Sequence, residues 1–124
     1  MKTTGLSIIA TEILVHALDD WVHGPELHAI AKDVQPNADD ARVLAHVLGA
    51  LHELVKGGFI SIGTVTSSGF VESEEVESVL FGRLEREWRA LGRPSVPGEI
   101  CWVSLTPSGR SEAERIVHAG ASGG

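Results

Sequence analysis

Hydrophobic residues recur at helical spacing along most of the chain, and the clearest example lies in the middle of the sequence. There, one apolar stripe returns every three or four positions, at Leu44, Leu48, Leu51 and Val55. This spacing places the four side chains on one face of an α-helix. The following segment, 59–65, is rich in β-branched residues, so we expect this helix to lead directly into a β-strand.

Polar residues and glycines mark both ends of this helix. Asn37 or Asp39 can cap its first turn, because a short side-chain oxygen accepts a hydrogen bond from a backbone N–H that has no partner within the helix. Gly57 and Gly58 can end it, since glycine readily adopts the left-handed conformation that follows many helices. We therefore expect a helix that begins near residue 39 and stops at these two glycines.

The same patterns predict four more helices and a second strand. They are a first helix at 6–22, a second at 25–35, an inserted helix at about 73–92, a strand at 100–105 and a last helix from 107 onward. Residues 119–124 (AGASGG) lack an apolar stripe, so we expect a disordered tail there. The rest, 1–118, is expected to form a single domain.

Composition narrows the class of protein. With 124 residues, 43% hydrophobic and 22% charged, the chain is an ordinary globular sequence of one-domain length. A formal net charge of −7 provides no overall attraction to nucleic acid or to an anionic membrane. Cys101 is the single cysteine, which excludes an intramolecular disulfide and favours a reducing, cytoplasmic location. No stretch contains the roughly 20 apolar residues that a membrane span needs, so no membrane partner is expected.

Two local motifs resemble the bacterial MarR, PadR and ArsR regulators. Segment 51–60 (LHELVKGGFI) is similar to the end of a recognition helix that turns into a wing strand, and segment 104–110 (SLTPSGR) is similar to the exit from the last wing strand. The resemblance implies a mostly helical α+β fold, the winged helix-turn-helix, with a two-stranded wing. One difference is that an inserted helix separates the two wing strands here, where family members usually have a short hairpin.

The resemblance also implies a small DNA-binding transcription regulator that acts as a homodimer. In such proteins the recognition helix reads base edges, and other cations hold phosphates. The candidate DNA-binding residues are Arg42, His46 and Lys56 on the third helix and Arg83, Arg86 and Arg89 on the inserted helix. The alternative is a solvated helix face, because three cations accompany five carboxylates between residues 24 and 58.

A protein-interaction module that does not bind DNA is the second hypothesis, for example an adaptor, antirepressor or toxin-neutralising partner. Segment 66–78 contains four glutamates and no basic residue, whereas the wing tip of the family usually offers Arg or Lys. Phe81 and Trp88, with Arg93 nearby, are candidates for a partner or dimer interface. The alternatives are that the aromatic rings belong to the core and that the arginines form surface ion pairs of small energy.

Metal binding and catalysis find less support in the sequence. His16, His23 and His28 lie near acidic residues, and His46 and His52 share the third helix, so imidazole and carboxylate ligands for zinc are present. No two of these histidines stand four positions apart, which favours surface histidines over a metal site. Nucleophile-elbow, P-loop and dinucleotide motifs are all missing, so we expect neither an enzyme nor a cofactor.

Overall fold

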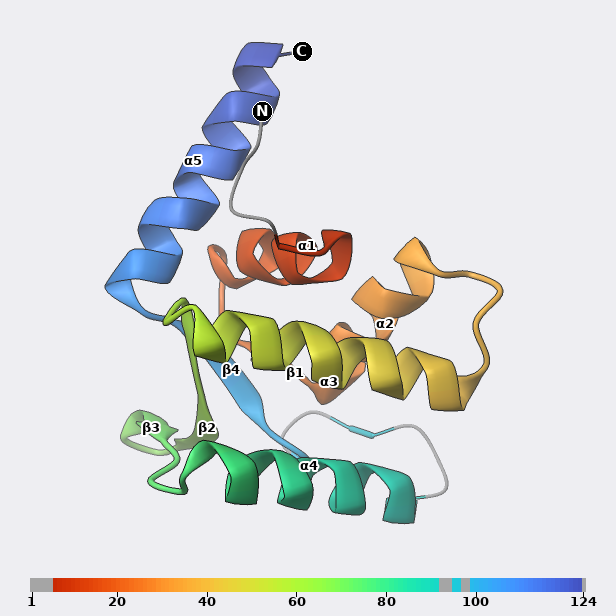
Figure 1. The fold of residues 1–124 in the computed structure, drawn as a ribbon. Helices are drawn as coiled ribbons and strands as arrows, with labels where there is room; N and C mark the ends of the chain where they lie inside the picture. Colours follow the sequence, from red (N-terminus) through yellow and green to blue (C-terminus); the bar gives the residue numbers. More distant parts are fainter. Residues whose placement is uncertain (1–5, 92–94, 97–98, 124) are drawn as a thin grey trace.

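The computed structural model describes residues 6–91, 95–96 and 99–123, which form an α+β arrangement that is mostly helical (Figure 1). This part of the chain contains five helices and one four-stranded antiparallel sheet. The helices are α1 (Ile8–Ala17), α2 (Gly24–Val34), α3 (Asp40–Lys56), α4 (Glu77–Leu91) and α5 (Pro107–Gly123). The strands are β1 (Val22–His23), β2 (Ile60–Thr66), β3 (Gly69–Glu72) and β4 (Trp102–Leu105). The predicted fold class, α+β and mostly helical, is confirmed.

The sheet has the strand order β1-β4-β2-β3, so the last strand of the sequence lies between the first and the second. β4 pairs with β2 in a register that sets Ile60 opposite Leu105, and with β1 in a register that sets Val22 opposite Val103. β2 and β3 form a tight hairpin, with Thr66 opposite Gly69. The sequence predicted β2 and β4 but neither β1 nor β3, so the expected two-stranded wing is part of a larger sheet.

The first helix is shorter than predicted, and the segment after it is a strand. α1 ends at Ala17, where Leu18 donates to the carbonyl of Val15 at 3.2 Å in a tighter, three-residue turn. Asp20 then accepts a hydrogen bond from the backbone N–H of Trp21 at 2.7 Å, which holds the chain out of the helix. Val22 enters the sheet as a fully buried residue instead of extending the helical stripe.

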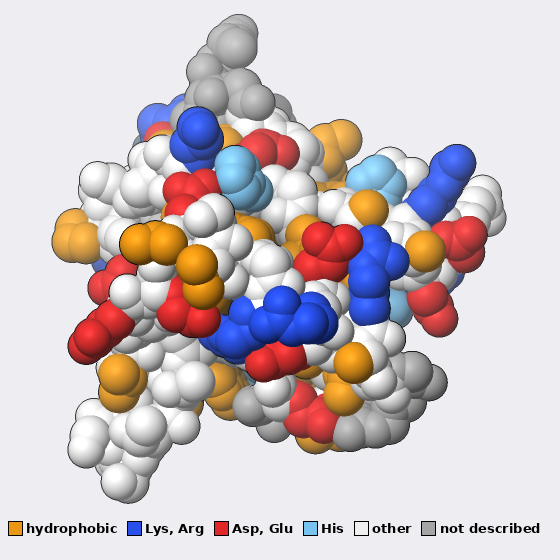
Figure 2. Space-filling view, turned by 60° about the horizontal axis from the view of Figure 1, so that its bottom comes forward, with side chains coloured by type: hydrophobic (Ala, Val, Ile, Leu, Met, Phe, Trp, Pro, Cys, Tyr) orange, Lys and Arg blue, Asp and Glu red, His pale blue; other side chains and the backbone are white. Residues whose placement is uncertain are grey.

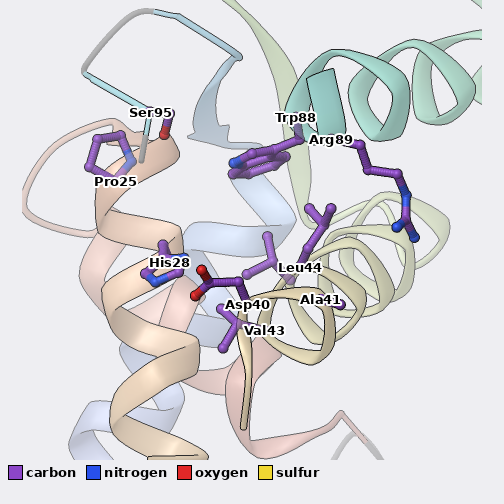
Figure 3. Close-up of a pocket in the computed structure, with 10 residues that line it drawn as sticks. Pro25, His28, Asp40, Ala41, Val43, Leu44, Trp88, Arg89 and Ser95 are labelled. Atoms are coloured by element: carbon purple, nitrogen blue, oxygen red, sulfur yellow. The ribbon is translucent and has the colours of Figure 1, made fainter. Parts of the chain in front are cut away.

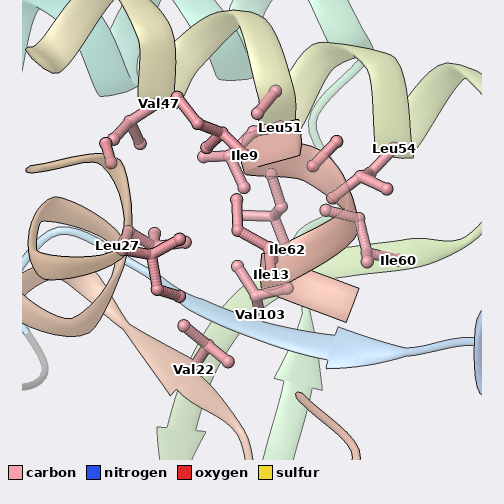
Figure 4. Packing of buried hydrophobic residues seen from close by; sticks show 14 of the residues in the cluster. Ile9, Ile13, Val22, Leu27, Val47, Leu51, Leu54, Ile60, Ile62 and Val103 are labelled. Atoms are coloured by element: carbon pink, nitrogen blue, oxygen red, sulfur yellow. The ribbon is translucent and has the colours of Figure 1, made fainter. Parts of the chain in front are cut away.

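The predicted central helix is confirmed together with both of its ends. Asp39 caps α3 by accepting from the N–H of Arg42 at 2.9 Å. After the last residue of α3, Gly58 takes a positive φ of 78°, which glycine adopts without a Cβ penalty. The buried face of α3 packs on α1 and the sheet, where Leu51 and Leu54 lie close to Ile62 and neighbouring apolar side chains (Figure 4).

The insert between β2 and β4 contains the strand β3 and the helix α4. α4 spans Glu77–Leu91, within the predicted range of about 73–92, and buries Leu80 and Leu84. In Figure 1, α3 lies between α1 on one side and α4 on the other. The inserted helix is therefore packed along the outer side of α3 instead of projecting away from the domain.

The last helix is joined to the end of α3 through Thr106. The Thr106 hydroxyl donates to the carbonyl of Gly58 at 2.6 Å and accepts from the N–H of Gly109 at 3.0 Å. α5 then packs on α1 and extends beyond the rest of the domain (Figure 1). It continues to Gly123, so it includes most of segment 119–124, for which the sequence predicted a disordered tail.

Candidate functional site

The third helix has three faces with different surroundings. Val43, Val47 and Leu54 are buried in the core. A second face is turned to α4 and includes Leu44 and His52. The third face is open to solvent, and its exposed residues are Arg42, Ala45, His46, Gly49 and Lys56. Among the described residues, this third face carries most of the exposed side chains of α3.

α4 is held against the part of α3 between Leu44 and His52. At one end, Nε2 of His52 lies 2.8 Å from Oε2 of Glu77, and the His52 ring meets the edge of Phe81 with 5.2 Å between ring centroids. In the middle of α4, Leu84 is fully buried. At the other end, Trp88 lines a cavity shared with α3. These contacts span roughly three turns of α4.

Two of the three candidate arginines of α4 are engaged in ion pairs. Arg83 contacts Glu75 at 2.8 Å and Glu87 at 3.0 Å. Arg89 contacts Glu85 at 2.9 Å. The hydrogen bond from Arg83 lowers the pKa of the Glu75 carboxyl below its usual value, because it stabilises the charged form. The positive charge available to an external phosphate is therefore smaller than the count of arginines suggests.

Arg86 differs from its neighbours on α4. It is exposed, and within the described residues it has no ion pair. Lys and Arg side chains gather in the middle of the face shown in Figure 2, with acidic and hydrophobic side chains beside them. Of the candidate phosphate contacts on α4, Arg86 is the one without a direct ion pair among the described residues, and its charge contributes, after that of Arg83, to the lowered pKa of Glu75.

The candidate base-reading residues share the open face of α3 but do not form a compact site. Arg42, His46 and Lys56 are all exposed. At about 1.5 Å of rise per residue, Arg42 and Lys56 lie about 21 Å apart along the helix axis. This separation exceeds the screening length of about 8 Å at physiological salt. The two cations therefore act as separate charges.

The segment from β3 to the first turn of α4, where the sequence predicted the tip of a wing, is acidic and carries exposed aliphatic side chains. Val71, Val76 and Val79 are 48%, 67% and 54% exposed. Glu72 and Glu74 are exposed beside them in the sequence. Because Leu80 donates to the carbonyl of Val76 at 2.9 Å, a helical turn already begins there and places Val76 and Val79 one turn apart. We call these five residues the acidic wing surface.

The candidate interface residues of α4 occupy inward positions. Phe81 contacts His52 and Trp88 lines the cavity next to α3, and both rings are half-buried. These contacts give both rings a role in packing α4 on α3. Arg93, the third candidate, lies outside the described residues.

A cavity of about 600 Å³ lies between α2, α3 and α4 (Figure 3). Residues from all three helices line it, among them Pro25, His28, Asp40, Leu44, Trp88 and Arg89. The sequence contains no motif for this site, because its residues belong to separate helices. The sequence feature that could have indicated the cavity is Trp88, a large aromatic residue on a predicted helix that is otherwise rich in charged residues.

The histidines that cluster in the sequence have separate structural roles. His23 caps α2 by accepting from the N–H of Glu26 at 3.3 Å, and its ring packs against Trp102. Nδ1 of His16 lies 2.8 Å from the carbonyl oxygen of Glu12, one turn earlier on α1. Within the described residues, no three His, Cys, Asp or Glu side chains converge as a metal site would require.

Cys101 is a poor candidate for a nucleophile. Its side chain is buried, and burial raises the pKa of the thiol to about 12, because the thiolate loses its hydration. The reactive form is therefore scarce at neutral pH.

Across 6–91, 95–96 and 99–123, no helix combines the length and the apolar character of a membrane span.

Comparisons with known proteins assign no family to the chain. No protein-family model, no curated protein and no solved structure matches the chain.

Proposed function

We propose that the chain is a winged-helix module that binds a protein partner through its acidic wing surface and does not read DNA through α3. Three features support the winged-helix assignment. Three helices precede a β-hairpin, β1 pairs with the strand that returns after the hairpin, and segment 104–110 leads from that strand into the last helix.

The observation that carries the proposal is the position of α4 against α3. The major groove of B-DNA is about 12 Å wide and admits one helix. A single helix with its side chains is already about 10–12 Å across, and packed helices lie about 8–10 Å apart. The α3–α4 pair is therefore roughly 20 Å wide on this side, which is too wide for the groove. With α4 in place, α3 can meet a groove only with its open face, which carries Arg42, His46 and Lys56.

The charge distribution supports the same conclusion. Non-specific DNA affinity comes mainly from cations that replace the counterions of phosphates. Arg83 and Arg89 are already paired with glutamates, and the wing contributes carboxylates instead of cations. Few phosphate contacts then remain to hold a duplex.

The chemistry of the acidic wing surface indicates the kind of partner. Exposed valines offer apolar area, and the glutamates around them favour a partner whose surface is basic with an apolar centre. Charge complementarity of this kind accelerates association and selects against acidic partners. Three aliphatic side chains within segment 71–79, Val71, Val76 and Val79, are 48%, 67% and 54% exposed and offer apolar area to a partner.

Site-specific photo-crosslinking tests the proposal in native cells. A photoreactive amino acid at Val76 is expected to capture one defined protein, whereas the same amino acid at Arg110, exposed on α5, is not. The double variant Glu72→Lys, Glu74→Lys should then abolish the Val76 adduct while the circular-dichroism spectrum is unchanged. Equal labelling from both positions, or an adduct that survives the charge reversal, contradicts the proposed surface. An adduct with the mass of a second copy reassigns the surface to self-association.

A DNA-binding regulator is the second candidate, because Arg42, His46 and Lys56 remain exposed on the open face of α3. Fluorescence anisotropy with a random duplex at low salt separates the two. We expect no binding even at about 50 mM salt, where phosphate contacts are strongest. Binding that weakens steeply with salt and is lost in Arg42→Glu would instead establish the regulator.

A further inference from the structure

The cavity between α2, α3 and α4 has the dimensions of a small-molecule site. Its volume of about 600 Å³ falls within the range of about 300–1,000 Å³ that is typical of ligand pockets. It lies at the opposite end of α4 from Val76 and Val79, so it is separate from the acidic wing surface. An inference about it does not depend on the proposed function.

Apolar side chains form most of its wall. Val43 and Val47 are buried at its base, and Leu44 completes this apolar floor. The indole of Trp88 stands over the floor from α4, as Figure 3 shows. An aromatic ring and an aliphatic surface on neighbouring walls suit a flat, apolar ring system, since stacked rings gain contact area and a favourable geometry.

Among the described residues that line the cavity, two side chains carry a formal charge, the carboxylate of Asp40 and the guanidinium of Arg89. The side chains of His28 and Asp40 point toward one another, whereas Arg89 extends away from both (Figure 3). The charge of Arg89 is compensated by Glu85 at 2.9 Å. Asp40 has no ion pair within the described residues, so its carboxylate is the uncompensated charge of the site.

We propose that this cavity binds a small aromatic amine. Its ring would lie between Trp88 and the apolar floor, and its ammonium group would donate to the Asp40 carboxylate. A cation near the indole face gains a further favourable interaction with the ring quadrupole. An aromatic acid of the same shape would instead place its carboxylate next to Asp40, and Arg89, the cation among the described lining residues, already has Glu85 as a partner.

Isothermal titration calorimetry with a matched pair of probes tests this proposal. 2-Naphthylmethylamine should bind, and 2-naphthoate, which has the same ring system and the opposite charge, should bind at least tenfold more weakly. In two-dimensional NMR spectra the amine should shift the indole N–H signal of Trp88 more than those of Trp21 and Trp102, which do not line the cavity.

Two charge-removing variants make the test specific. Because Asp40 is exposed, Asp40→Asn should weaken amine binding by about two- to fivefold, the usual effect of losing an exposed ion pair. Asp33→Asn removes the same charge from an exposed position of α2 outside the cavity and should leave the affinity unchanged. Circular dichroism confirms that both variants fold. The proposal is overturned if the amine does not bind, if both probes bind equally, if Asp40→Asn binds like the wild type, or if Asp33→Asn weakens binding to the same extent.

Discussion

Replacing Gly109 with alanine tests how closely α5 approaches the end of α3. A Cβ atom at this position would lie 1.8 Å from the carbonyl oxygen of Phe59, a distance that non-bonded atoms do not tolerate. The opposing atom belongs to the main chain, so it cannot move aside by a rotamer change. Either α5 or the Phe59 peptide must shift by more than 1 Å to restore an ordinary contact.

The cost of this shift follows from the contacts around it. Overpacking a tight site costs about 1–3 kcal/mol. The carbonyl of Phe59 also accepts from the N–H of Thr106 at 3.0 Å, and its displacement loses about 1 kcal/mol more. Alanine recovers about 1 kcal/mol, because it favours the helix more than glycine does. The free energy of unfolding should therefore fall by about 1–3 kcal/mol.

Urea denaturation followed by circular dichroism measures this change. With a slope of about 1–3 kcal/mol per molar urea, the midpoint should fall by roughly 1 M. Gly82→Ala is the matched control, because Gly82 is exposed within α4 and a Cβ there has no atom within 4 Å. That variant should gain about 0.5–1 kcal/mol. A Gly109→Ala midpoint equal to or above that of the wild type would refute the close approach.

Three further predictions concern single side chains. Leu84→Ala should lower the free energy of unfolding by about 2–5 kcal/mol in urea titrations, because its side chain is fully buried, and should accelerate amide hydrogen exchange in α4. Arg83 lowers the pKa of the Glu75 carboxyl in the folded protein below its unfolded value of 4.5. The charged carboxylate therefore stabilises the fold above pH 4.5, and this stabilisation is lost as the pH falls through the folded pKa. Glu75→Gln should flatten the pH dependence of the free energy of unfolding in that range. The Cys101 thiol has a pKa of about 12 in the folded protein, so it should react with a thiol reagent only in the unfolded chain. The absorbance of the reagent at mildly alkaline pH, measured with and without urea, tests this prediction.

The elements predicted correctly are those whose signals are local. α3 carries its own apolar stripe, its cap at Asp39 and its stop at Gly57 and Gly58, so no distant contact is needed to define it. β1 was missed because Val22 continues the helical period of α1 by chance, and His23 falls in the break that the sequence predicts after that helix. Val22 is a strand residue because it pairs with Val103, about 80 positions later. The local hydrophobic pattern contains no information about this pairing.

The same distinction separates the parts of the candidate site. Arg42, His46 and Lys56 were expected on the exposed face of α3, and helical periodicity alone placed them there. The ion pair of Arg83 with Glu75 joins residues on either side of the start of α4, so it depends on how the chain turns into the helix. The cavity depends on how three helices pack, which single-sequence periodicity does not determine.

The place of β4 in the sheet has a consequence for the order in which the chain folds. β1 and β2 are not paired with each other, and β4 lies between them. The β2–β3 hairpin and the helices can form from nearby segments, but β1 pairs with β4, which follows it by about 80 residues. Contacts between distant segments are slow to form, because loop closure must precede them. We therefore expect insertion of β4 to limit the folding rate and β1 to be the last strand to gain protection from hydrogen exchange.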